Sequence, residues 1–149
     1  MSRELTEAEL TDLGARIGCN LVVGDVILLS GPVGVGKTTF ARAIIAGAGH
    51  LGEVVSPSYT LVQVYDFEEM RLPVWHADLY RLKNADEVEA LSLFEALEDG
   101  ALLVEWPERG GRAVPGPALG ITLRIARRTT RIADVHVPEV WEERWSAIA

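Results

Sequence analysis

Eight residues, Gly31-Pro32-Val33-Gly34-Val35-Gly36-Lys37-Thr38, match the phosphate-binding pattern G-x-x-x-x-G-K-[ST] at every fixed position. The apolar run VILLS at 26–30 precedes them and predicts a buried strand, and residues 39–46 follow with helical spacing. A strand, a glycine-rich loop and a helix form the setting in which this pattern becomes a P-loop. The alternative is a glycine-rich turn before an ordinary helix, which the complete pattern and its flanks disfavour.

A P-loop predicts a bound nucleoside triphosphate with Mg²⁺. Its consecutive backbone N–H groups point at phosphate oxygens, and the following helix adds the positive end of its dipole. We expect Lys37 to reach the β- and γ-phosphates and the Thr38 hydroxyl to hold the metal ion. The predicted nucleotide-binding residues in this stretch are Gly34, Val35, Gly36, Lys37, Thr38 and Thr39.

Composition indicates one ordinary globular domain, residues 1–149, with 48% hydrophobic and 24% charged residues. The single cysteine, Cys19, excludes an internal disulfide and a metal site built from cysteines. We expect a cytoplasmic protein with no membrane segment, because no apolar stretch approaches membrane-spanning length and residues 1–9 contain no apolar signal region.

The net charge of −8 argues against broad nonspecific binding to nucleic acid, which depends on Lys and Arg neutralising phosphates. One dense basic group remains, formed by Arg124, Arg127, Arg128 and Arg131. A solvated edge of a C-terminal hairpin is the favoured interpretation of this group, and an RNA-binding surface is the alternative.

The N-terminal segment predicts a short amphipathic helix that ends near Gly18. Thr6 and Glu9 have the spacing of a capping box, and Leu10, Leu13 and Ile17 then repeat at helical intervals. Core packing explains this spacing, and we favour that interpretation. Because the helix precedes the P-loop strand, it could also flank the nucleotide base, and Thr11 is the candidate contact.

Hydroxyl side chains concentrate in Ser56-Pro57-Ser58-Tyr59-Thr60, which predicts a loop. P-loop proteins often sense the γ-phosphate through such a loop between the first helix and the next strand. A plain turn with capping side chains is the alternative. Residues 61–65 and 74–78 then predict two strands, and the short segment between them would join the strands as a hairpin.

Two acids follow apolar strands. Asp78 ends the segment 74–78, and Glu105 comes near the end of the more apolar run 101–106. A Walker-B acid must emerge at the carboxyl end of a buried strand beside the P-loop, within reach of the metal. Glu105 has the better strand for this role, and Asp78 would share the water shell of the metal or orient the attacking water.

The remaining segments complete an α/β prediction. Asn84 with Glu87 predicts a capped helix with Val88, Leu91, Phe94 and Leu97 on one face. Its acids at 86, 87, 89, 95, 98 and 99 suggest a solvated face or, alternatively, a docking surface for a partner. Segments 120–126 and 131–137 alternate like antiparallel strands, and Trp141 and Trp145 predict a packed terminal helix.

Four stretches together resemble the bacterial TsaE (YjeE) ATPases, which support the synthesis of threonylcarbamoyladenosine in tRNA. They are Gly31–Phe40, Ser56–Leu61, His76-Ala-Asp-Leu-Tyr-Arg-Leu82 and Leu103-Val-Glu-Trp-Pro-Glu108. Their order and spacing match, and the resemblance covers nearly the whole chain. Ser58 stands where the family usually has threonine, and the hydroxyl is kept.

The resemblance implies a three-layer P-loop NTPase fold with a mostly parallel central sheet and antiparallel strands at its edge. It also implies an ATPase that is slow alone and works with TsaD and TsaB, so that tRNA is reached only through this complex. Thr38 and Glu105 would hold Mg²⁺, and Asp78, Glu105, Thr60 and Trp106 would form the catalytic or switch apparatus. Arg81 and Arg109 are the nearby candidates for an arginine finger.

Two other functions remain open. A small P-loop kinase of a metabolite would need a lid, and only the loop 107–118 is free to serve as one. A nucleotide-gated adaptor would use Glu105 and Asp78 only to bind metal. A GTPase is disfavoured, because the chain contains no Asn-Lys-x-Asp motif for reading guanine.

Overall fold

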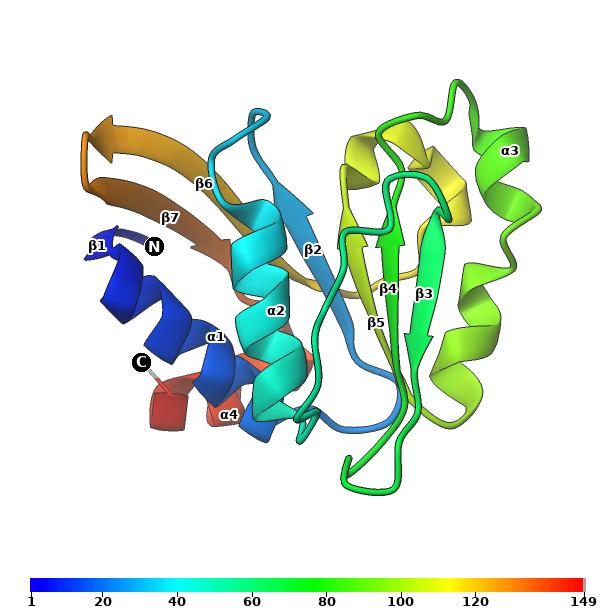
Figure 1. Cartoon of the computed structure of the whole chain (residues 1–149), viewed down its shortest axis with the longest axis horizontal. Helices are drawn as coiled ribbons and strands as arrows, with labels where there is room; N and C mark the ends of the chain where they lie inside the picture. Colours follow the sequence, from blue (N-terminus) through cyan, green and yellow to red (C-terminus); the bar gives the residue numbers. More distant parts are fainter. Residues whose placement is uncertain (149) are drawn as a thin grey trace.

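One mixed sheet organises the molecule. The computed structural model describes residues 1–148, and seven strands form a sheet with the order β1-β7-β6-β2-β5-β4-β3 (Figure 1). The strands are β1 (Ser2–Thr6), β2 (Val26–Ser30), β3 (Val62–Tyr65), β4 (Val74–Asp78), β5 (Ala101–Glu105), β6 (Leu119–Arg127) and β7 (Thr130–His136). The central strands β6, β2, β5 and β4 are parallel, whereas β3, β7 and β1 pair antiparallel at the edges. This arrangement confirms the predicted fold class.

Helices cover both faces of the sheet and give three layers. On one face lie α1 (Glu7–Cys19), α2 (Lys37–Gly47) and α4 (Glu142–Ile148), and on the other lie α3 (Ala85–Glu89) and the 3-10 helix η1 (Leu93–Glu98) (Figure 1). Short 3-10 turns are η2 (Pro107–Arg109), η3 (Gly111–Ala113) and η4 (Glu139–Trp141). Alternate residues of β2 serve the two cores, since Ile27 packs with α1 and α2 while Val26 packs with α3 and η1.

Helix α1 begins with the predicted capping box and packs closely on α2. The Thr6 hydroxyl accepts from the amide of Glu9 at 3.2 Å, and the Glu9 carboxylate accepts from the amide of Thr6 at 3.1 Å. The two helices lie side by side (Figure 1). A Cβ on Gly18 would collide with the carbonyl oxygen of Ile44 and would lie 2.8 Å from the Cα of Gly47. Glycine at position 18 is therefore what allows this approach.

The terminal helix is fixed to the residue before β2 by a partly buried ion pair. Arg144 donates from both terminal nitrogens to the carboxylate of Asp25, at 2.6 and 3.0 Å. Its guanidinium also lies 3.8 Å from the ring centroid of Trp141. Trp141 and Trp145 are both buried, which confirms their predicted packing.

Two expectations about the secondary structure were incomplete or wrong. Asn84 does cap a helix, but α3 stops at Glu89, so no single helix carries the predicted apolar face; Val88, Leu91 and Leu97 still pack in one core. Ser92 has a φ of +53°, which breaks the helical path, and Phe94 is then 58% exposed. Strand β1 was not expected, because residues 2–6 contain only one apolar side chain, Leu5, and so show no alternation. The hairpins β3–β4 and β6–β7 confirm the predicted antiparallel pairs.

Among residues 1–148, no helix combines the length and the apolar character needed to cross a bilayer.

We expect Gly18→Ala to lower the free energy of unfolding by about 2 kcal/mol, as over-packing does in tight cores. The added methyl group meets the backbone of α2, which cannot rotate away as a side chain would. Urea unfolding followed by circular dichroism measures the change. Gly120→Ala is the matched control, because its Cβ would meet only the Cβ of His136 at an ordinary 3.6 Å. Equal stability of the two variants would contradict the close-packing argument.

Candidate functional site

The P-loop joins β2 to α2 and curls around its own glycines. Gly34 and Gly36 have φ values of +80° and +112°, a region that side-chain-bearing residues rarely adopt. Helix α2 then starts at Lys37, with the amide of Phe40 donating to the Gly36 carbonyl at 2.9 Å. The first amides of a helix have no partner within the helix, so those at the start of α2 are placed to bind an anion.

Lys37 is held over the loop by neutral partners. Its Nζ donates to the carbonyl oxygens of Gly31 at 2.5 Å and Pro32 at 2.9 Å, and lies 4.2 Å from the ring centroid of Trp106. Burial lowers the pKa of the Lys37 amine, and the carboxylates of Glu105 and Asp78 act in the opposite direction. The lysine is thus placed beside the loop by contacts with the protein alone.

The two predicted acids lie side by side at the ends of neighbouring parallel strands. Asp78 of β4 pairs in register with Glu105 of β5. Glu105 is 2% exposed and accepts from the Thr38 hydroxyl, with Oε1 at 3.0 Å and Oε2 at 3.3 Å. His76 contributes a third contact, its Nε2 lying 2.7 Å from Oε2 of Glu105. The predicted metal pair, Thr38 and Glu105, is therefore in direct contact.

Asp78 connects the hydroxyl loop to the sheet. Its Oδ2 accepts from the Ser58 hydroxyl at 3.2 Å, and its Oδ1 accepts from the amide of Tyr80 at 3.0 Å. Ser56 and Ser58 share a further hydrogen bond of 2.9 Å. The loop 56–60, which follows α2, is thus hydrogen-bonded through Ser58 to Asp78, the carboxylate beside Glu105.

These groups surround an open cavity of about 420 Å³, which we call the strand-end cavity. It is lined by Val33, Gly34, Gly36, Lys37, Thr38, Thr39, Ser56, Ser58, Asp78, Tyr80, Arg81, Glu105 and Trp106. Thr60, the predicted catalytic hydroxyl, is exposed and does not line it. Of the two arginine candidates, Arg81 lines the cavity and Arg109 does not, its guanidinium lying 5.5 Å from the ring centroid of Tyr80.

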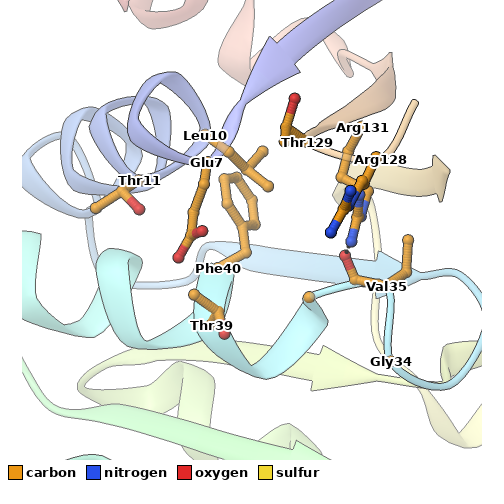
Figure 2. Close-up of a pocket in the computed structure, with 11 residues that line it drawn as sticks. Glu7, Leu10, Thr11, Gly34, Val35, Thr39, Phe40, Arg128, Thr129 and Arg131 are labelled. Atoms are coloured by element: carbon orange, nitrogen blue, oxygen red, sulfur yellow. Dashed lines mark hydrogen bonds between the residues drawn. The ribbon is translucent and has the colours of Figure 1, made fainter. Parts of the chain in front are cut away.

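A second cavity of about 240 Å³ lies between α1 and the β6–β7 hairpin, and we call it the helix–hairpin cavity. Figure 2 shows Glu7 and Thr11 reaching toward it from α1 and Arg128 and Arg131 from the hairpin. Gly34, Gly36 and Thr39 line both cavities, so the P-loop is the wall between them. Thr11 and Val35, which do not line the strand-end cavity, line this one.

Thr38 and Glu105 fit a magnesium ion by the chemistry of their donor atoms. Hydroxyl and carboxylate oxygens are its preferred ligands, and proteins usually bind it through one or two carboxylates together with phosphates. Within residues 1–148 no group of three or more His, Cys, Asp or Glu could hold a metal ion by itself. This pair therefore suits a metal ion that a nucleotide also ligates.

Several contacts at the site were missed by the sequence analysis. The basic group lies on the β6–β7 hairpin, in line with the favoured interpretation, but the contact of Arg131 with the P-loop was not foreseen: its Nε donates to the Val35 carbonyl at 3.0 Å. Glu7 carried no signal beyond its place in the first turn of a helix. His76 was assigned no role of its own, although its place two residues before Asp78 on a strand puts both side chains on one face.

Comparisons with known proteins agree with this geometry. The family model for the threonylcarbamoyl adenosine biosynthesis protein TsaE matches residues 5–133. The protein named tRNA threonylcarbamoyladenosine biosynthesis protein TsaE from Rickettsia bellii is 32% identical over 131 residues, which cover 87% of this chain and 90% of that protein. Its namesake from Streptomyces coelicolor is 36% identical over 84% of both chains. The crystal structure of YdiB from Bacillus subtilis superposes with a TM-score of 0.76 at 25% identity, covering 99% of this chain and 95% of that one. This chain belongs to the TsaE family.

Proposed function

We propose that this protein is a Mg²⁺-dependent ATPase that supports threonylcarbamoylation of the adenosine next to the anticodon in tRNA, in a complex with TsaD and TsaB. The observation that carries the enzymatic part is the contact of Thr38 with Glu105 at the mouth of a complete P-loop. The biological part rests on membership of the family and on the names of the relatives.

The nucleotide would span both cavities. The strand-end cavity, with Lys37 and the P-loop amides, suits the phosphates, because a helix N-terminus and an ammonium group both favour anions. The helix–hairpin cavity on the other side of Gly34 and Gly36 would receive the base, beside Thr11 and the apolar side chain of Phe40. Because Gly34, Gly36 and Thr39 line both cavities, the phosphates and the base would lie on opposite sides of the P-loop.

Thr38 and Glu105 would hold Mg²⁺, which neutralises charge developing on the transferred phosphoryl group when it is bound. Asp78 lies beside them and is fixed at both carboxylate oxygens by Ser58 and Tyr80. A carboxylate held in this way can accept a hydrogen bond from an attacking water and orient it. We assign Asp78 that role in hydrolysis.

The position of Arg81 supports the proposal that the protein alone hydrolyses ATP slowly. It lines the strand-end cavity, but its guanidinium lies 4.2 Å from the ring centroid of Tyr59, a residue that is 82% exposed. An arginine must point at the transferring phosphate to stabilise it. We propose that a partner either releases Arg81 from Tyr59 or supplies its own cation.

Filling the helix–hairpin cavity tests the division between base and phosphates. Thr11→Phe is expected to weaken ATP binding about tenfold, a cost of about 1.4 kcal/mol. Inorganic tripolyphosphate should bind unchanged, because it needs only the strand-end cavity. Isothermal titration calorimetry measures both ligands. Thr11→Ser, which keeps the space open, is the matched control, and equal losses for both ligands would refute this placement of the base.

The roles of Lys37 and Glu105 can be distinguished, because only the effect of substituting Glu105 should depend on Mg²⁺. Lys37→Ala is expected to weaken ATP binding about 100-fold with or without Mg²⁺, since a charged hydrogen bond to phosphate contributes about 3 kcal/mol. Glu105→Gln should still bind ATP in EDTA. It should no longer hydrolyse ATP, and its affinity for Mg²⁺ should fall at least about tenfold. Thermal unfolding checks that both variants are folded. Full ATPase activity in Glu105→Gln would exclude its metal role.

Reconstituted tRNA modification tests the biological part. With TsaD, TsaB and the synthase that supplies threonylcarbamoyl-adenylate, we expect multiple turnovers only when this protein and ATP are present. Unchanged modification without this protein would refute the proposal. Phosphate transfer to a small metabolite by the protein alone would indicate a kinase instead. ATP binding without phosphate release beside the partners would indicate a nucleotide-gated adaptor.

A further inference from the structure

His76 is a buried histidine that contacts a predicted metal ligand without facing the cavity. Its exposed fraction is 0%, and it is absent from the residues that line the strand-end cavity. Its Nε2 lies 2.7 Å from Oε2 of Glu105, whereas its Nδ1 has no hydrogen-bond partner among residues 1–148. Such a residue can act on a ligand only through the carboxylate that it touches.

The register of the sheet explains how His76 reaches Glu105. Strands β4 and β5 are parallel, with His76 paired to Leu103 and Asp78 paired to Glu105. Side chains two residues apart on a strand lie on the same face, so His76 sits one repeat behind Asp78 and diagonally behind Glu105. Glu105 is therefore contacted from the interior by His76 and from α2 by Thr38.

The hydrogen bond between His76 and Glu105 indicates which ring nitrogen of His76 carries a proton. An ionised carboxylate only accepts hydrogen bonds, and it already accepts from Thr38. Nε2 of His76 must then be the donor, and the tautomer that carries its proton on Nε2 has no N–H at Nδ1. This tautomer leaves no buried donor unpaired, which is the more costly kind of unsatisfied group.

We propose that His76 is a positioning residue. Its Nε2–H donates to Oε2 of Glu105 and so holds the carboxylate in the orientation in which Oε1 accepts from the Thr38 hydroxyl. The proposal rests on the proposed function, in which Glu105 and Thr38 hold Mg²⁺. The two oxygens of Glu105 are already divided, with Oε2 nearest His76 and Oε1 nearest Thr38. Without His76, only the Thr38 hydroxyl would hold the carboxylate, and its affinity for the metal ion would fall.

A pair of amide variants separates positioning from packing. The amide nitrogen of glutamine reaches the place of Nε2, whereas that of asparagine reaches only the place of Nδ1. His76→Asn is expected to weaken Mn²⁺ binding to the ADP-bound protein about tenfold, as loss of a supporting partner does in metal sites. His76→Gln should recover most of the affinity. Electron paramagnetic resonance of free Mn²⁺ measures both, and thermal unfolding compares their stabilities.

A purely structural role for His76 predicts equal losses of Mn²⁺ affinity in the two variants, and that result would overturn the proposal. A double-mutant cycle with Glu105→Gln sharpens the test, because a residue that acts through Glu105 has little further effect once the carboxylate is gone. Additive losses of affinity would count against positioning. Both variants should bind ADP in EDTA like the unmodified protein.

The tautomer can be tested without nucleotide or metal, which separates this inference from the proposed function. Nitrogen-15 spectra of labelled histidine should show His76 protonated at Nε2 only, with its signals assigned by their loss in His76→Gln. An Nδ1–H tautomer would overturn the positioning role even if ATP is hydrolysed. Failure of the wild-type protein to bind Mn²⁺, with the Nε2–H tautomer present, would instead refute the metal assignment and leave the hydrogen bond to Glu105 supported.

Discussion

The parallel pairing of β5 between β2 and β4 is the constraint on which the site depends. Because the carboxyl ends of parallel strands meet at one edge, this pairing brings the P-loop after β2 beside Glu105 of β5 and Asp78 of β4. The amide of Trp106 donates to the Leu29 carbonyl at 3.2 Å and continues the pairing beyond the strand. The antiparallel strands at the edges add area to the sheet and contribute no acid to the strand-end cavity.

This constraint forces charged groups into the interior, and their partners follow from that cost. Glu105, Asp78 and Lys37 are all at most 5% exposed. Isolated buried charges are unfavourable by several kcal/mol, so each must find hydrogen bonds or opposite charge. Glu105 is hydrogen-bonded to Thr38 and His76, and Asp78 to Ser58. Lys37 donates to carbonyl oxygens of the P-loop. The network that would bind Mg²⁺ and nucleotide is also what makes these residues tolerable in the folded chain.

The local parts of this site were predictable from sequence because their signals are local. The P-loop pattern, the apolar strands before Asp78 and Glu105, and the capping box at Thr6 each span only a few residues. The contacts that were missed join distant segments, such as Arg131 with Val35 and His76 with Glu105. Nothing in the spacing along the chain encodes the sheet order that brings them together. The broken helix after Glu89 was missed for a different reason, because apolar periodicity continues through Ser92 although the backbone does not.

Trp106, the residue after Glu105, has an uncommon backbone conformation. Its φ of +59° is uncommon for a residue with a bulky side chain, and such positions persist only where surrounding contacts hold them. Here the ring lies against the Lys37 ammonium on one side and the Tyr80 ring, 4.8 Å away, on another. Tyr80 is 44% exposed and follows Asp78 closely in sequence. Trp106 therefore joins the P-loop lysine to an exposed ring, and all three residues line the strand-end cavity.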